Sequence, residues 1–283
     1  MTERYVDLHT HSCVSDGSMK PAEVVRAAKD AGLAAMALTD HDEVAGIPEA
    51  AAEGERLGIE VVPGIELSAQ GKTEVHVLGF YPDVESRPFQ DALARIRDCR
   101  HQRMVRTSKL CRENGMDISM EEAESFANGG LLCRAHFARA MVARGWADSV
   151  KDAFDRWLGN GKPCHFDMQV FSPDEAVRLL KDANAVVCIA HLNQLHLPDE
   201  EVYAFLKSLL PCGLDGVEGW YTEYSAGQTH TYQEMARELG LICSGGSDFH
   251  GTMKPHISIG RGTGALRIPY QALENVKSRR KAR

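Results

Sequence analysis

Nine side chains of the types that bind metal ions recur along the chain, and almost every one follows a short apolar or β-branched run. They are His9, His11, Asp16, His41, Glu66, His76, His191, Asp248 and His250. Each of them alone is an ordinary polar residue at a turn. Placed after successive strands of a parallel barrel, they would meet at one edge of its sheet. The sequence therefore predicts a single polynuclear metal site.

Short apolar runs alternate with amphipathic helical patterns on both sides of the middle of the chain. Strands are expected at 5–9, 34–40, 59–69, 74–80, 185–191, 216–220 and 241–248, and helices at 20–32, 47–58, 172–184, 199–210 and 228–240. Pro21, and Pro173 after an N-capping Ser172, mark two helix starts. Apolar strands separated by helices are typical of a parallel sheet covered on its outside. Seven such strands predict an α/β fold with a closed or nearly closed barrel.

The middle of the chain breaks this alternation. Helical patterns follow one another at 88–115, 119–127, 133–145 and 149–159, with no strand pattern between them. We therefore predict a barrel formed by 1–82 and 166–283, with a helical insertion at 83–165 after the fourth strand, on the side where barrel active sites form. A basic series in the first of these helices winds round it and is expected to be mostly solvated: Arg97, Arg100, Arg103, Arg106, Lys109 and Arg112. The tail 277–283 is expected to be frayed.

Composition favours an ordinary globular protein in the cytoplasm. No stretch approaches the ~20 apolar residues of a membrane span, and the amino terminus has no signal-peptide core, so no membrane partner is expected. The eight cysteines form no C-x-x-C pair or disulfide framework. We expect reduced thiols, with Cys188 and Cys243 serving as small apolar residues inside strands.

Charge is distributed unevenly between the two parts. The net charge of −8 argues weakly against generic nucleic-acid binding. The segment 83–165 holds 14 Lys and Arg against 12 Asp and Glu, whereas the rest of the chain holds 18 against 28. An acidic body with a mildly basic insertion suits a site in which carboxylates hold cations and the insertion attracts an anion, although random surface variation explains the charges equally well.

The types of the nine residues narrow the choice of metal. His9 and His11 are two apart on an extended segment, so both side chains point the same way and can reach one ion. Imidazole with carboxylate ligation suits zinc, manganese or iron better than calcium or a bare magnesium site. Because no cysteine is among the nine, a structural zinc site with thiolate ligands is not favoured.

The ordered motifs also resemble those of a known family. H-T-H-S…D-G, T-D-H-D, P-G-x-E, H-x-L-G, A-H and S-D-x-H occur here in that order, as in the PHP (polymerase and histidinol phosphatase) domain. The resemblance covers the chain apart from the insertion, and it implies a distorted (β/α)7 barrel with two or three metal ions. The insertion with its C-R-A-H-F-A-R-A segment is similar to that of small stand-alone phosphoesterases of the family.

The resemblance further implies which residues bind which ion. The first ion would be bound by His9, His11, Glu66 and Asp248, the second by Glu66, His76 and His191, and the third by Asp16, His41 and His250. All nine positions are present, so we expect three divalent ions, with Mn²⁺ first and Zn²⁺ or Fe²⁺ as alternatives. Metals acidify a water towards hydroxide for attack on phosphorus and neutralise the phosphoryl oxygens. Asp248 and His191 are the expected proton-transfer residues.

Four residues are predicted to bind the substrate. Arg134 and His136 lie near the first turn of a helix, where free backbone N–H groups also attract an anion, and the resemblance places this segment on the phosphate. Lys162 lies in a G-x-G-K string that lacks the spacing of a P-loop, so its role stays open between phosphate binding and a solvated turn. Tyr221 follows the sixth strand and either stacks on a base or sugar or packs against the insertion.

The expected function is the hydrolysis of a small phosphorylated metabolite, such as a 3′,5′-nucleotide bisphosphate or a cyclic sugar or nucleotide phosphate. Two alternatives use the same metals: 5′-3′ exoribonuclease action on short RNA, and a monophosphatase of the histidinol-phosphate type. A continuous basic groove would favour the nuclease, whereas a cover over one nucleotide-sized pocket would oppose it. A non-catalytic scaffold would be expected to have lost ligand residues, and none is lost. The oligomeric state stays undetermined.

Overall fold

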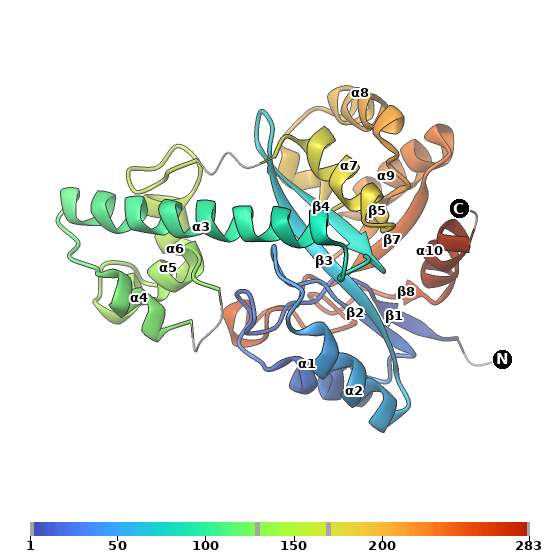
Figure 1. Ribbon diagram of the computed structural model, residues 1–283, viewed down its shortest axis with the longest axis horizontal. Coiled ribbons are helices and arrows are strands. Elements are labelled where there is room, and N and C mark those ends of the chain that lie inside the picture. Colours follow the sequence, from blue (N-terminus) through green and yellow to red (C-terminus); the bar gives the residue numbers. More distant parts are fainter. Residues whose placement is uncertain (1–2, 128–130, 168–170, 282–283) are drawn as a thin grey trace.

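The computed structural model describes residues 3–127, 131–167 and 171–281, and it contains one sheet of eight strands (Figure 1). The strand order is β7-β6-β5-β4-β3-β2-β1-β8. Beyond the ends of β1 and β7 the two chain segments also meet, through the hydrogen bond from Leu8 N to Gly245 O (3.0 Å) and a parallel bridge between Thr10 and Phe249. This contact closes the barrel. The strands are β1 Tyr5–Asp7, β2 Ala35–Leu38, β3 Glu60–Gln70, β4 Glu74–Phe80, β5 Val186–Ile189, β6 Gly216–Tyr221, β7 Ile242–Gly246 and β8 Ile268–Pro269.

The distorted barrel expected from the sequence is confirmed, but its sheet is not parallel throughout. Strands β1, β2 and β3 run in parallel, as do β5, β6 and β7, whereas β4 is antiparallel to both β3 and β5. The reason is the connection: β3 and β4 are joined by a hairpin at 71–73, and a crossover helix is needed to keep two neighbouring strands parallel.

Helices cover the outside of the barrel, and they begin where the sequence signals place them. Pro21 opens α1, and Ser172 precedes Pro173, the first residue of α7, while the Glu175 side chain accepts a hydrogen bond from Ser172 N (2.8 Å). None of the described helices is both long and apolar enough to cross a membrane. The outer helices are α1 Pro21–Asp30, α2 Ile47–Leu57, α7 Pro173–Asp182, α8 Asp199–Leu209 and α9 Ala226–Leu239.

The end of the chain differs from the expectation. Instead of a frayed tail, β8 pairs with β1 and is followed by α10, Gln271–Lys281. Ala272, Leu273 and Val276 of α10 are buried against the barrel. Their spacing puts them on one side of a helix, and this short apolar stripe outweighs the repulsion within the basic cluster.

The expected helical insertion follows β4, and one long helix joins it to the barrel (Figure 1). The first half of α3 packs on the barrel through Phe89, Leu93 and Ile96, and its second half contributes Met104 and Cys111 to a separate apolar core of the insertion. Because one continuous helix enters both cores, the insertion is held in a defined place beside the barrel. Its elements are α3 Arg87–Glu113, α4 Met120–Ser125, α5 Arg134–Ala143, α6 Val150–Ala153 and the π-helical turn η1 Phe154–Leu158.

Gly246 makes the barrel closure possible. A Cβ atom at this position would lie 2.0 Å from the Cβ of His9 and 2.6 Å from its backbone nitrogen. Only a residue without a side chain lets the end of β7 approach the segment that follows β1 so closely. The closure therefore depends on the contact between Gly246 and His9, the first of the nine candidate metal-ligand residues.

We predict that Gly246→Ala destabilises the protein by at least about 1–3 kcal/mol, the usual cost of overpacking, because the new methyl group must displace backbone. Urea unfolding followed by circular dichroism measures this change. Gly227→Ala is the matched control: a Cβ there meets only the Ser225 hydroxyl at 3.8 Å, and alanine favours the α9 helix. Equal stability of the two variants would contradict the role given to Gly246.

Candidate metal centre

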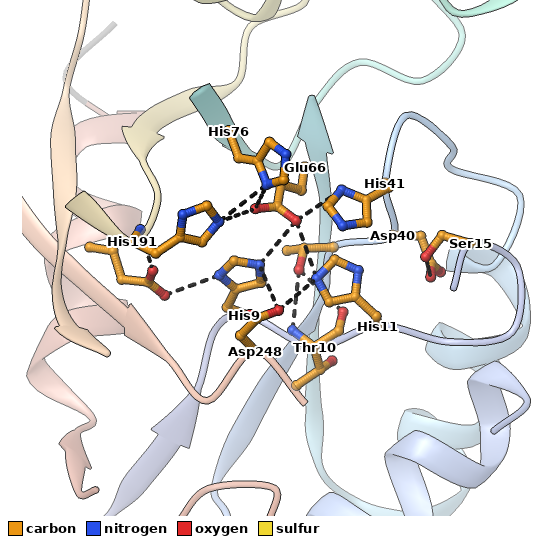
Figure 2. A network of polar contacts seen from close by, with 12 residues as sticks. His9, Thr10, His11, Ser15, Asp40, His41, Glu66, His76, His191 and Asp248 are labelled. Carbon is orange, nitrogen blue, oxygen red and sulfur yellow. Dashed lines mark hydrogen bonds and ion pairs between the residues drawn. The ribbon is translucent and has the colours of Figure 1, made fainter. Parts of the chain in front are cut away.

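The nine residues singled out in the sequence lie together at the end of the barrel where the parallel strands finish, and Figure 2 labels all of them except Asp16 and His250. His9 and His11 follow β1, His41 follows β2, and His191 follows β5, whereas Glu66 and His76 lie within β3 and β4. Asp248 and His250 follow β7, and Asp16 lies in the loop between β1 and α1. The β3–β4 hairpin thus supplies two of the nine from paired strands instead of from a loop.

Glu66 is the centre of this group, and its two carboxylate oxygens face different imidazoles (Figure 2). Oε2 lies 3.1–3.2 Å from ring nitrogens of three histidines: His9, His11 and His41. Oε1 lies 3.1 Å from Nδ1 of His76 and 3.1 Å from Nε2 of His191. A carboxylate with one oxygen towards each group has the geometry of a ligand that bridges two cations.

Two aspartates extend the group on either side. Asp248 Oδ1 lies 3.4 Å from His11 Nε2 and 3.7 Å from His9 Nε2. Asp16 Oδ1 lies 3.1 Å from His250 Nε2, and the other Asp16 oxygen lies 3.9 Å from His41 Nε2. Ligand atoms of three overlapping sets lie within 4.8 Å of one another: His11, Asp16, His41 and His250; His9, His11 and Glu66; His41, Glu66 and His76.

Unsatisfied polar atoms in this cluster indicate that it can bind cations. Several of its buried atoms lack a hydrogen-bond partner among the described residues, namely Nε2 of His9, both ring nitrogens of His11, Nδ1 of His41 and Oε2 of Glu66. Buried polar atoms are normally paired, and leaving one unpaired costs about 1–3 kcal/mol. Lone pairs of imidazole and carboxylate that face one another satisfy this requirement when they bind divalent metals. The residues present therefore fit a metal centre.

The carboxylates and imidazoles of the cluster shift one another's pKa values. Burial would raise the pKa of Glu66, but the imidazoles of His9 and His41 outweigh it and hold that pKa well below its ordinary value. Burial holds the pKa of His41 well below its ordinary value, against the attraction of Glu66 and Asp16. Against the effect of burial, Asp248 and Glu66 raise the pKa of His11 to about 9, and Glu66 raises the pKa of His76 to about 10. The carboxylates thus attract positive charge, as protons or as metal ions, to the lone pairs of these imidazoles.

Glu218 supports the centre from inside the barrel, and our reading of the sequence missed it. Its Oε1 accepts a hydrogen bond from His9 Nδ1 (3.1 Å), and its Oε2 accepts one from the backbone nitrogen of His191 (2.8 Å). The first contact turns His9 Nε2 towards Glu66 and fixes the ring. The signal was present, because Glu218 is a lone carboxylate in the apolar strand GVEGW and is fully buried.

Two buried aspartates fix the loops that carry other residues of the cluster. Asp7 accepts hydrogen bonds from Ser247 N (2.8 Å) and Gly260 N (2.7 Å), which positions the segment leading to Asp248. Asp40 accepts hydrogen bonds from Ser12 N (2.8 Å) and the Ser15 hydroxyl (2.6 Å). The serines beside the motifs thus hold turns in place.

The backbone is strained at two of the nine residues. His191 has φ 25° and Asp248 has φ 57°, a region that side-chain-bearing residues seldom adopt. Such strain persists only where surrounding contacts enforce it. At His191 the contact is the hydrogen bond to Glu218, and at Asp248 its backbone nitrogen donates to His9 O (2.9 Å).

The predicted substrate residues Arg134 and His136 lie at the start of α5 but differ in their surroundings. Arg134 lines a cavity beside the cluster and donates to Glu74 Oε2 (2.7 Å). His136 is buried, its Nδ1 accepts a hydrogen bond from Cys133 N (3.0 Å), and burial lowers its pKa to about 4. His136 is thus a neutral residue that caps the helix. It carries no positive charge with which to attract an anion.

The other two predicted substrate residues are also placed differently from one another. Tyr221 is buried, and its hydroxyl donates to Asp248 Oδ2 (2.9 Å). Burial and the nearby Asp248 raise the pKa of Tyr221 well above its ordinary value, so the hydroxyl stays protonated and donates. Lys254 donates to the same oxygen (2.6 Å). Lys162 is an exposed residue in the turn after η1, with its backbone nitrogen bonded to Gly159 O.

The basic series on α3 is not solvated throughout, contrary to the expectation for two of its members. Arg100 is 8% exposed and forms an ion pair with Asp42, and Arg103 is 5% exposed and contacts Glu74 Oε1 (3.4 Å). Both face the barrel because the turn of α3 that carries them lies over the cavity. Together with Arg134 they line the cavity that also includes Asp16, His41, Ser68 and His76.

A distorted α/β barrel with histidines and carboxylates around its open end defines a metal-dependent hydrolase site. The sequence fits a model of one such family over residues 7–163, and the chain belongs to the PHP domain family. Among curated relatives, a 5′-3′ exoribonuclease of Haemophilus influenzae is 32% identical over 256 residues, covering 88% of this chain and 91% of the relative. A phosphoribosyl 1,2-cyclic phosphate 1,2-diphosphodiesterase of Eggerthella lenta is 31% identical, covering 89% and 97%.

A third relative and a solved structure agree with this family. The 3′,5′-nucleoside bisphosphate phosphatase of Chromobacterium violaceum is 31% identical over 247 residues and covers 87% of each chain. A structure described as a metal-dependent phosphoesterase, from Bifidobacterium adolescentis, has a TM-score of 0.87 and 28% identity, covering 98% of this chain and 96% of that one. The protein is accordingly a metal-dependent phosphoesterase.

We predict that Glu218→Gln lowers the affinity for metal about 10- to 100-fold, the usual effect of losing the partner of a ligating histidine. The amide keeps the shape of the side chain but no longer attracts the His9 N–H as a carboxylate does. Competition with a metal-binding dye measures the affinity. Glu223→Gln, at an exposed position nearby, is the control and should leave it unchanged. Equal affinities for the two variants would contradict the role of Glu218.

Proposed function

We propose that the protein hydrolyses a small phosphorylated metabolite, with a 3′,5′-nucleotide bisphosphate or a cyclic sugar or nucleotide phosphate as the substrate. One observation carries this proposal: a single cavity is lined by Asp16, His41 and His76 on the side of the barrel and by Arg100, Arg103 and Arg134 on the side of the insertion. A phosphate group between them would face the metal ions on one side and guanidinium groups on the other. Guanidinium groups match phosphate oxygens in shape and charge.

The proposal includes three divalent ions, with Mn²⁺ as the first choice. The first would be held by His9, His11, Glu66 and Asp248, the second by Glu66, His76 and His191, and the third by Asp16, His41 and His250. Such ions supply an acidified water as nucleophile and neutralise charge on the phosphoryl oxygens. Three overlapping groups of ligand atoms support the number of ions, and Glu66, which belongs to two of the groups, supports its role as a shared ligand.

Asp248 and His191 are the residues proposed to handle protons. Asp248 Oδ2 accepts hydrogen bonds from Tyr221 and Lys254, which leaves Oδ1 facing His9 and His11. His191 is held by its backbone bond to Glu218, with its Nε2 towards Glu66. Fixed in this way, each can take or give a proton without moving its side chain.

Arg134 is proposed to bind the phosphate. It is the first residue of α5, a helix of 10 residues, so the free N–H groups of that helix end add to its attraction for an anion. Its present partner, Glu74, keeps the guanidinium turned towards His76 and the metal cluster. The insertion 83–165 would then act as the cover of the site. His136 would hold the start of α5 in place, and Lys162 would lie in the exposed turn after η1.

The two alternatives differ in what extends beyond the cavity. Short RNA would need a path for further nucleotides, and the similarity to the exoribonuclease of H. influenzae keeps this reading open. A monophosphatase of the histidinol-phosphate type would need no second phosphate or base. The cavity between barrel and insertion favours a small substrate over a continuous nucleic-acid groove.

The proposal predicts phosphate or nucleotide release by the manganese-loaded protein from 3′,5′-bisphosphonucleotides or from ribose 1,2-cyclic phosphate. Histidinol phosphate and a short 5′-phosphorylated RNA test the alternatives in the same assay. Arg134→Ala should lower kcat/KM about 10- to 150-fold, because a charged hydrogen bond contributes about 1.5–3 kcal/mol. Arg144→Ala, at the exposed end of the same helix, should leave it unchanged. No release from any of the four substrates would exclude the proposal.

Asp16→Ala should remove about one of three metal equivalents while the protein keeps its fold, because Asp16 belongs to the third proposed ligand group and lies nearest to His250, at 3.1 Å, with His41 and His11 both at 3.9 Å. Elemental analysis of the dialysed protein measures the metal content, and circular dichroism checks the fold. Asp148→Ala, at an exposed position in the insertion, is the control. Full metal content in Asp16→Ala would show that the third ion is wrongly assigned.

A further inference from the structure

Two large apolar side chains are exposed among the described residues: Val105, 47% exposed, and Phe166, 44% exposed. Phe166 belongs to none of the four apolar clusters of the described chain, and its ring contacts no other described ring or cation. The exposed part of such a ring loses the free energy of its burial. The backbone of Phe166 is also linked to an arginine of the candidate site.

The backbone of Phe166 is tied to the wall of the phosphate cavity. Its carbonyl oxygen accepts a hydrogen bond from Arg103 Nε (2.9 Å), and the same guanidinium group contacts Glu74 Oε1 (3.4 Å) inside the cavity. Arg103 Nη2 also lies 3.4 Å from Nε2 of the preceding residue, His165. One planar group thus joins the segment that carries Phe166 to the cavity.

The segment before Phe166 is anchored as well. Cys164 is fully buried in the core of the insertion, and its backbone nitrogen donates to Trp157 O (2.8 Å). His165 Nδ1 accepts a hydrogen bond from Gly161 N (3.2 Å). The ring is therefore carried by a fixed backbone that is one hydrogen bond away from a cavity lined by arginines. A rigid aromatic face beside an anion site is the arrangement on which proteins stack nucleobases.

We propose that Phe166 is the stacking surface for a nucleobase, so that the substrate is a nucleotide and not a base-free sugar phosphate. This inference rests on the proposed function, because it assumes that the phosphate of the substrate occupies the cavity lined by Arg103 and Arg134. Stacking on one ring tolerates any base, since every base has a π-face. The ring sets the class of substrate and leaves the identity of the base open.

Equilibrium binding tests the proposal without any need for turnover. Isothermal titration calorimetry of the manganese-loaded protein compares AMP with ribose 5-phosphate, which lacks the base. Phe166→Ala should weaken AMP binding about 5- to 150-fold, the fold-change of one lost base–aromatic stack, and leave ribose 5-phosphate unchanged. Phe166→Trp should keep the affinity for AMP. Val105→Ala removes an equally exposed apolar side chain from α3 and should change neither ligand.

The outcomes separate the base site from the proposed function. Equal affinity of the wild-type protein for AMP and ribose 5-phosphate, or an unchanged AMP affinity in Phe166→Ala, would overturn the base site. Binding of AMP that depends on Phe166, with no hydrolysis of any phosphate ester, would count against the proposed function alone. A 5′-phosphorylated trinucleotide distinguishes the sources of the base: equal losses for AMP and the trinucleotide support a free nucleotide, and a larger loss for the trinucleotide than for AMP supports an RNA end.

Discussion

The structure depends on one carboxylate, Glu66, placed among five imidazoles at the open end of the barrel. Its two oxygens face separate histidines at 3.1–3.2 Å, and the fully buried His9 and His11 are among them. Bringing so many lone pairs out of water is unfavourable unless cations satisfy them. The barrel closure at Gly246, the strained backbone at Asp248 and the apolar core below the site all serve to hold these atoms where cations can do so.

Three buried acids, Asp7, Asp40 and Glu218, convert the fold into a rigid frame for that carboxylate. Asp7 and Glu218 lie within strands, and Asp40 lies two residues after β2. Each accepts a hydrogen bond either from a loop that carries candidate metal-ligand residues or from the ring of one of them. Burial raises the pKa values of Asp7 and Asp40, while hydrogen bonds from Ser247 and Ser15 counteract that rise. An acid in an apolar strand is costly unless its partners are fixed, so the loops and the strands stabilise one another.

Much of this arrangement could be predicted from the sequence, because residues at successive strand ends must share one rim whatever their exact neighbours. The direction of β4 could not be predicted in that way, since strand patterns do not encode the hairpin that replaces a crossover. Glu218 was missed because a single acid in a strand predicts no partner until the fold places His9 beside it. The burial of Arg103 was not predicted for a related reason. Helical spacing tells which residues share a face of a helix, but not which face the barrel covers.

In the proposed site, the insertion supplies positive charge from a fixed position. Arg100 on α3 binds Asp42, the residue after His41, so the helix contacts the loop that carries a candidate metal-ligand residue. Arg103 and Arg134 share Glu74, two residues before His76 on the same face of β4. The ion pairs of Asp42 and Glu74 therefore connect the insertion to the segments that carry His41 and His76. Breaking a buried pair of this kind leaves an unpaired charge, so barrel and insertion are held together where the phosphate would bind.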